Sequence, residues 1–175
     1  ESADGTVKYL FDVGEGRKVE SVYIPEADRA TLCISSQKGC RMNCYFCMTG
    51  RQGFHGNLTA NQIINQVLSI PQTHSLTNIV FMGMGEPLDN IDPVLKVIEI
   101  LTAEWGFAWS PKRITVSTVG VKPALRELVE NTQVHIAVSV HNAVSEERQS
   151  MMPLEKVYGI RDVMEMLGEY DFAHQ

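Results

Sequence analysis

A short apolar run that leads directly into a cysteine loop opens the α/β part of this chain: residues 30–47 read ATLCISSQKGCRMNCYFC. Residues 30–35 have the length and composition of a buried strand. Three more runs of this kind follow, at residues 78–82 (NIVFM), 113–117 (RITVS) and 134–140 (VHIAVSV). Together the four runs predict the strands of a sheet that is covered by other elements.

Helical patterns alternate with these strands. They cover residues 59–70, residues 92–106, a segment that begins near residue 123, and residues 160–170. Thr59 and Gln62 have the spacing of a capping box, and Asp92 is the expected N-cap of the second helix. The expected inward residues are Ile63, Ile64, Val67, Val94, Val97, Ile98, Leu101, Leu125, Leu128, Val129, Val163, Met164 and Leu167. Four strand–helix units in succession predict an α/β fold with a parallel sheet.

The first 28 residues differ from the rest, because they contain several glycines and short alternating stretches but no helical pattern. We expect a β-hairpin-like extension over residues 1–28 and one α/β core over residues 29–175. The chain of 175 residues starts at Glu1 rather than at methionine, and the core stops after about four units. We therefore expect a segment of a longer protein.

Charge is unevenly distributed along the chain. The formal net charge is −6, yet residues 29–85 contain no aspartate or glutamate. Two interpretations are open: a solvated surface of uneven composition, or a local cationic field that attracts a carboxylate or a phosphate backbone. The sequence has neither an apolar run long enough for a membrane span nor a signal-peptide pattern.

All four cysteines lie between residues 33 and 47. Clustered thiols without a secretory pattern indicate metal or redox chemistry in a reducing compartment, so we expect a cytoplasmic protein. Cys40, Cys44 and Cys47 form a C-x3-C-x2-C loop. Three thiolates suit a 4Fe–4S cluster with one iron open to a ligand, whereas structural zinc sites use four ligands. The alternative is a small zinc knuckle that recruits Cys33 or His55 as its fourth ligand.

Reactive and polar residues follow each predicted strand, where the chemistry of parallel α/β sheets gathers. They are the cysteine loop after the first strand, Gly85-Glu86-Pro87 after the second, Ser117-Thr118 at the third and Ser139-Val140-His141 at the fourth. Gly-Glu-Pro alone predicts only a turn. Its place one strand after the cysteine loop gives it more weight.

The C-x3-C-x-aromatic-C spacing, followed by Gly-Glu-Pro one strand later, resembles the signature of the radical S-adenosylmethionine (SAM) superfamily. This resemblance implies a partial (β/α) barrel in which Cys40, Cys44 and Cys47 ligate the cluster. It also implies that the cluster and SAM generate a carbon radical, and that Phe46 lines the adenine pocket.

The surrounding residues resemble the RlmN/Cfr family of radical-SAM RNA methyltransferases, which act on adenine carbons. The resemblance rests on residues 30–40, on 53–59 and on 81–88 (FMGMGEPL), and residues 22–25 and 35–37 favour its RlmN branch. That branch acts on adenine carbon 2 in 23S rRNA and in some tRNAs. An electron donor such as flavodoxin is an implied partner. Ordinary transfer from SAM cannot methylate carbon 2, because this carbon is neither nucleophilic nor acidic.

The same resemblance implies a role for individual residues. SAM is expected to contact Phe46, Gly85, Glu86, Ser117, Ser139, Val140 and His141. Cys33 is the expected thiol that resolves a covalent enzyme–RNA intermediate by forming a disulfide, and Glu20 the expected proton acceptor. Cys33 and Glu20 each have an alternative without a catalytic role: Cys33 as a small buried apolar residue in a strand, and Glu20 as a solvated charge in a hairpin.

The chain departs from the family pattern in several ways. No cysteine follows Cys47 to carry the methyl group, and Gly56 stands where arginine is common. We therefore expect this segment alone to hold the cofactors without methylating RNA. Other radical-SAM enzymes, such as a carbon-8 methyltransferase or an activase, and a zinc-stabilised RNA-binding module remain the alternatives.

Overall fold

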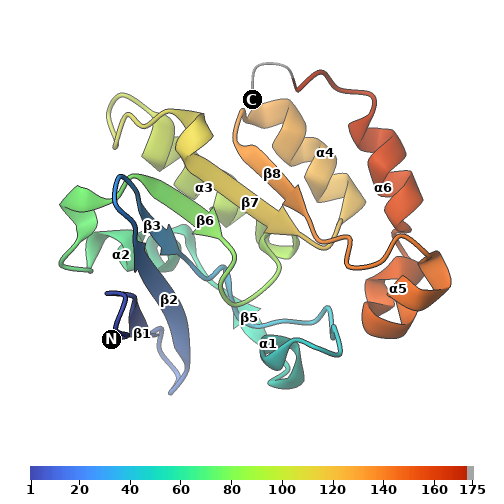
Figure 1. Ribbon diagram of the computed structural model, residues 1–175, viewed down its shortest axis with the longest axis horizontal. Helices are drawn as coiled ribbons and strands as arrows, with labels where there is room; N and C mark the ends of the chain where they lie inside the picture. The colour runs from blue at the N-terminus through green and yellow to red at the C-terminus, as the bar shows by residue number, and fades with distance from the viewer. Residues whose placement is uncertain (173–175) are drawn as a thin grey trace.

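Six strands form one sheet in which an antiparallel hairpin is joined to four parallel strands (Figure 1). A computed structural model describes residues 1–172 of the chain. In the order of the sheet, the strands are β1 (Val7–Asp12), β2 (Lys18–Pro25), β3 (Ala30–Cys33), β6 (Asn78–Phe81), β7 (Ile114–Thr118) and β8 (His135–Val138). β1, β2 and β3 pair antiparallel, and β3, β6, β7 and β8 pair parallel. The predicted α/β class with a parallel sheet is confirmed.

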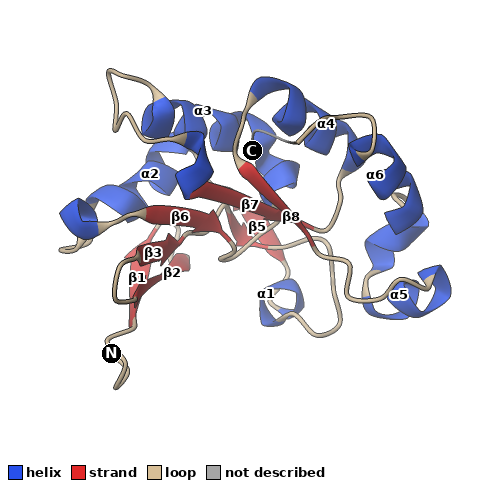
Figure 2. Ribbon diagram, turned by 45° about the horizontal axis from the view of Figure 1, so that its top comes forward, coloured by secondary structure: helices blue, strands red, loops and turns tan. Residues whose placement is uncertain are grey.

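Helices follow the parallel strands and cover one face of the sheet, as Figure 2 shows. They are α2 (Ala60–Leu68), α3 (Ile91–Thr102), α4 (Lys122–Asn131) and α6 (Ile160–Leu167). α2 begins at the predicted capping box, in which the Thr59 hydroxyl accepts a hydrogen bond from the backbone N–H of Gln62. These helices and the sheet enclose the main core, which includes Leu32, Ile79, Val116 and Leu125, all fully buried.

Smaller elements line the carboxyl ends of the parallel strands. They are a two-stranded sheet, β4 (Gln37–Gly39) with β5 (Phe54–Asn57), the short helices α1 (Met48–Arg51) and α5 (Ser145–Met151), and the 3-10 turns η2 (Pro87–Asn90) and η4 (Pro153–Lys156). Two further 3-10 turns, η1 (Thr73–Ser75) and η3 (Pro111–Arg113), connect elements elsewhere. The sequence predicted none of these elements. β4 and β5 are short, glycine-containing and polar, so they carry no alternating apolar pattern.

Three details of the predicted helices are wrong. Asn90 rather than Asp92 is the N-cap of α3, because η2 leads directly into the helix. This helix ends at Thr102, since the chain turns sharply before Gly106. In α6 the side chain of Met164 is exposed, and Met166 is the residue that faces the core.

The hairpin of β1 and β2 lies within the residues expected to form a β extension. β2 also pairs with β3, so the hairpin continues the main sheet. The domain boundary at residue 28 remains a prediction. In the part of the chain that the structure describes, no helix is both long and apolar enough to cross a membrane.

Candidate active site

The carboxyl ends of β3, β6, β7 and β8 surround a cavity of about 320 Å³. Its walls come from the cysteine loop, the loop after β6, the ends of β7 and β8, and the segment before η4. The lining residues are Cys40, Met42, Cys44, Phe46, Cys47, Phe81, Met82, Gly83, Gly85, Glu86, Ser117, Thr118, Val119, Ser139, His141 and Met152. All three thiols of the loop and Glu86 thus face one space.

Backbone contacts hold the cysteine loop in place. The N–H of Cys40 donates to the carbonyl of Gly53 at 3.1 Å, and the N–H of Tyr45 donates to the carbonyl of Met151 at 2.9 Å. Gly39 has a φ of +84°, and a Cβ there would collide with the Gly53 carbonyl. Only glycine therefore lets the two strands of the β4–β5 hairpin approach so closely.

The three thiols are well suited to binding a cationic centre. All are free; Cys40 and Cys44 are buried, and Cys47 is half-buried. Burial raises the pKa of the Cys40 thiol to about 11. A thiolate at this position is costly without a compensating positive charge, so a metal centre would be bound with release of a proton.

Glu86 is the buried acid of the cavity, with 3% of its surface exposed. Its carboxylate accepts hydrogen bonds from the Thr118 hydroxyl at 2.6 Å, from the N–H of Val119 at 3.0 Å and from the N–H of Leu88 at 3.1 Å. Burial nevertheless raises its pKa to about 7, although these hydrogen bonds oppose the shift. Among the described residues, no cation forms an ion pair with this carboxylate.

A buried glutamine connects the Glu86 loop to the cysteine loop. The Gln37 side-chain oxygen accepts a hydrogen bond from the N–H of Glu86 at 2.9 Å, and its amide nitrogen donates to Asp89 at 2.7 Å. Arg41, next to the first cysteine, pairs with the same Asp89 at 2.8 Å. Gly85 has a φ of +101°, and a Cβ there would overlap Gln37.

A family model described as the Radical SAM superfamily matches residues 34–174, which include every residue that lines this cavity. The match covers most of the chain. The chain belongs to the radical SAM superfamily.

Curated relatives and a solved structure are also similar to this radical SAM chain. A probable dual-specificity RNA methyltransferase RlmN from Parabacteroides distasonis is 63% identical over 99% of the chain and 51% of the relative. The dual-specificity RNA methyltransferase RlmN of Syntrophobacter fumaroxidans is 46% identical over 95% of the chain and 50% of the relative. The crystal structure of a radical SAM methyltransferase from Sphaerobacter thermophilus has a TM-score of 0.89 at 39% identity, over 94% of this chain and 50% of that one. The chain spans about half the length of these proteins.

Four of the expected SAM contacts, Ser117, Ser139, Val140 and His141, lie at or just after the ends of β7 and β8. Ser117 and Ser139 line the cavity, while Val140 follows them in the chain and is partly exposed. The ring of His141 lies 4.5 Å from the ring of Phe46, centroid to centroid, so the two form an aromatic wall. His141 has a φ of +54°, a strained backbone conformation for a residue with a Cβ.

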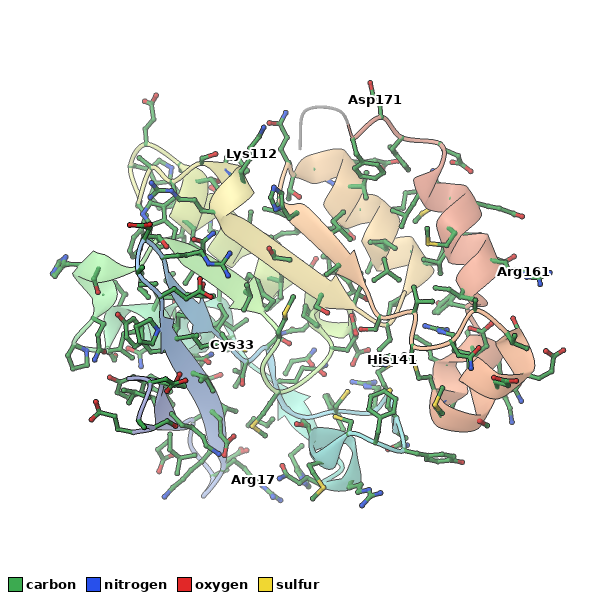
Figure 3. All side chains as sticks on the ribbon, viewed as in Figure 1. Arg17, Cys33, Lys112, His141, Arg161 and Asp171 are labelled. Carbon is green, nitrogen blue, oxygen red and sulfur yellow. The ribbon has the colours of Figure 1, made fainter. Side chains whose placement is uncertain are left out.

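Glu20 and Cys33 do not line the cavity. The pairing of Val22 with Cys33 places the side chains of Glu20 and Cys33 on the same face of the sheet, because side chains alternate along strands. The parallel register places Ser117 on this face too. It is the face opposite α2, α3, α4 and α6, and Cys33 is the last residue of β3 (Figure 3). Glu20 pairs there with Lys8 at 3.3 Å.

The zinc-knuckle alternative requires Cys33 or His55 as its fourth ligand. Cys33 and His55 are absent from the cavity walls, and a ring nitrogen of His55 lies 2.9 Å from the carbonyl of Gln52. Within residues 1–172, no three histidine, cysteine, aspartate or glutamate side chains converge on a single metal ion. A 4Fe–4S cluster does not require the three thiolates to converge on one metal ion, because each thiolate binds a different iron atom.

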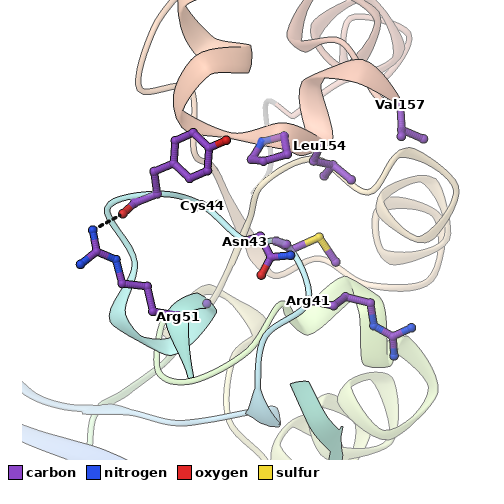
Figure 4. Close-up of a pocket in the computed structure, with 10 residues that line it drawn as sticks. Arg41, Asn43, Cys44, Arg51, Leu154 and Val157 are labelled. Atoms are coloured by element: carbon purple, nitrogen blue, oxygen red, sulfur yellow. Dashed lines mark hydrogen bonds between the residues drawn. The ribbon is translucent and has the colours of Figure 1, made fainter. Parts of the chain in front are cut away.

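A wider cavity of about 760 Å³ lies between the cysteine loop and η4 (Figure 4). Arg41, Arg51, Leu154 and Val157 line it, with only Cys44 among the thiols. Because it contains neither Glu86 nor the strand ends, the smaller cavity is the candidate active site.

The sequence named Thr118 only as a polar residue at a strand end, and it gave no role to Gln37 or Arg148. Thr118 binds Glu86 directly, Gln37 positions the Glu86 loop, and Arg148 donates to the backbone carbonyls of Val119, Ser139 and Val140 at 2.9–3.0 Å. Thr118 was named with Ser117, and Gln37 lies in the stretch 35–37 that resembles the RlmN branch, so the sequence did point to both positions. Arg148 lies in a helix without an apolar stripe, so the sequence gave no signal of its role.

Proposed function

We propose that this chain is the cofactor-binding half of a radical-SAM methyltransferase that acts on adenine carbon 2 of 23S rRNA and tRNA. The observation that carries the proposal is the arrangement of three cysteine thiols and a buried glutamate around one cavity at the strand ends; this glutamate has no ion-pair partner in the described part of the chain. The RlmN names of the relatives support the substrate class.

The residues of the cavity fit the proposed cofactors. Cys40, Cys44 and Cys47 would ligate a 4Fe–4S cluster, which supplies reductive cleavage of SAM when both are bound. Glu86 offers its carboxylate to the ammonium group of SAM, a cation that would compensate the buried charge. The backbone at Gly85 and the hydroxyls of the two serines offer further polar contacts.

Phe46 and His141 form an aromatic wall against which the adenine ring of SAM would stack. Two residues outside the cavity would process the target base. Glu20 would accept the proton released from the adenine. The thiol of Cys33 would form a disulfide with the sulfur of the methyl-carrying cysteine, and the carbon–sulfur bond that links this cysteine to the RNA would break and free the product. Burial raises the pKa of Cys33, so its thiol stays protonated until a base activates it. The methyl-carrying cysteine would lie outside this chain, and flavodoxin or a similar donor would deliver electrons.

Anaerobic reconstitution of the intact protein tests the proposal. Iron and sulfide analysis should give a cluster, and SAM, reductant and unmodified rRNA should give 5′-deoxyadenosine and 2-methyladenosine. Cys40→Ser should lose both iron and products. Cys33→Ser is the matched control: it should keep iron and sulfide and lose only methyladenosine. Zinc without sulfide would instead establish a zinc-stabilised module, and 8-methyladenosine would establish the carbon-8 branch.

A further inference from the structure

A basic cavity lies between the tip of the β1–β2 hairpin and the β4–β5 hairpin. Its volume is about 400 Å³. The lining residues are Gly16, Arg17, Lys18, Lys38, Gly39, Gln52, His55 and Met84. Gly39 precedes Cys40 and Met84 precedes Gly85, so this cavity shares two loops with the candidate active site. The chemistry proposed for the active site uses none of its cationic side chains.

The charges of this cavity are only partly compensated. Lys38 pairs with Glu15 at 3.1 Å, and its side chain is 14% exposed. Arg17 and Lys18 are exposed and form no ion pair with any residue that the structure describes. Asp12 lies opposite Lys18 in the hairpin, where its carboxylate accepts a hydrogen bond from Gly14. Two cations therefore remain available to an anionic ligand.

Backbone hydrogen bonds hold the turn that carries Arg17 and Lys18. The N–H of Arg17 donates to the carbonyl of Gly14 at 2.9 Å, and the carbonyl of Arg17 accepts from Val13 at 3.0 Å, which closes the hairpin turn. Gly56 has a φ of +124°, and a Cβ there would lie 3.2 Å from Cε of Lys38. Glycine thus leaves room for the aliphatic part of Lys38 to pack beneath the cavity. In Figure 3, Arg17 lies at the edge of the molecule, beyond the open face that carries Cys33.

We propose that this cavity binds the phosphodiester backbone of the RNA strand beside the nucleotide that enters the active site. The inference rests on the proposed function. Cations that contact phosphates supply affinity and register without reading sequence. An acidic protein is a poorer match, because protein interfaces are centred on aromatic residues and the only large apolar residue in these walls is Met84.

Fluorescence anisotropy of the intact protein with a labelled single-stranded RNA, without SAM or reductant, tests the inference. R17Q/K18Q should weaken binding about tenfold near 100 mM salt, and the slope of log affinity against log salt should fall by about 1.4 for two lost contacts. K112Q/R161Q removes the same charge from exposed residues far from the cavity (Figure 3) and should change affinity less than about twofold.

Each outcome decides between the two proposals. Equal weakening by both double variants, or no weakening by R17Q/K18Q, would overturn the cavity assignment and leave the proposed function standing. Displacement of the RNA by polyglutamate as readily as by polyuridylate would assign the cavity to an acidic protein. No RNA binding by the wild type would overturn the proposed function itself.

Discussion

Two buried carboxylates near the strand ends differ in whether a cation accompanies them. Glu155, in η4, pairs with the guanidinium of Arg148, which is itself fully buried. Glu86, in the loop after β6, has three hydrogen-bond donors and no cationic partner among residues 1–172. The pKa values differ accordingly. Burial raises the pKa of both groups, but hydrogen bonds from Ser145, Arg148 and Ile160 lower that of Glu155 overall, whereas that of Glu86 rises to about 7.

The difference distinguishes an ion pair with a structural role from a carboxylate that is available to bind a cationic ligand. The Arg148–Glu155 pair is saturated, since the guanidinium also holds three backbone carbonyls. It fixes the ends of β7 and β8, from which the expected SAM contacts come. Glu86 faces the cavity with an uncompensated charge, which a cationic ligand would compensate.

The largest expected effect is the loss of folding stability when the Arg148–Glu155 ion pair is broken. Glu155→Gln leaves Arg148 buried without its counter-charge, and this should lower the free energy of unfolding by about 3 to 5 kcal/mol. Urea unfolding of the metal-free protein measures it. The control is Glu130→Gln, which breaks an exposed pair with Arg126 and should cost less than about 1 kcal/mol. Similar losses in the two variants would show that Arg148 does not depend on its partner.

The same pair marks the limit of what the sequence could predict. Strands and helices with an apolar stripe were predicted within a few residues, because burial of such a stripe drives their packing. α5 has the sequence SEERQSM, and the group that it buries is the charged Arg148. Periodicity cannot reveal a helix that is anchored by an ion pair and by carbonyls distant in sequence.

The residues of the candidate site also differ in whether the sequence could predict their roles. The cysteine loop and Glu86 could be predicted, because their spacing and their place after strands are visible in the chain. The roles of Gln37 and Thr118 depend on hydrogen bonds to residues 49 and 32 positions away. Such contacts form where segments distant in sequence meet at the strand ends, and no local pattern specifies them.

The second prediction concerns pH. The pKa of Glu86 rises from 4.5 to about 7 on folding, so its contribution to stability is complete below pH 4.5 and is lost as the pH rises through 7. The wild type should therefore lose about 2 to 3 kcal/mol relative to Glu86→Gln between about pH 5 and pH 8. Urea unfolding of both metal-free proteins at several pH values measures this difference.

Glu155→Gln is the matched control for this pH dependence. The pKa of Glu155 is lowered, so its contribution is lost only as the pH falls below the ordinary value of 4.5. Its difference from the wild type should stay constant between about pH 5 and pH 8. A flat profile for Glu86→Gln as well would show that the Glu86 carboxylate is already compensated.

The smallest effect should come from a single donor to Glu86. Thr118→Val keeps the shape of the side chain and removes the hydroxyl that lies 2.6 Å from the carboxylate, which should cost about 1.5 kcal/mol at high pH. Because this hydrogen bond favours the charged form, its loss should move the pH midpoint above 7. Ser117→Ala alters the neighbouring hydroxyl on the open face and should leave both quantities nearly unchanged. If the midpoint moved down instead, the hydroxyl would be stabilising the protonated acid, and Glu86 would not be a site prepared for a cation.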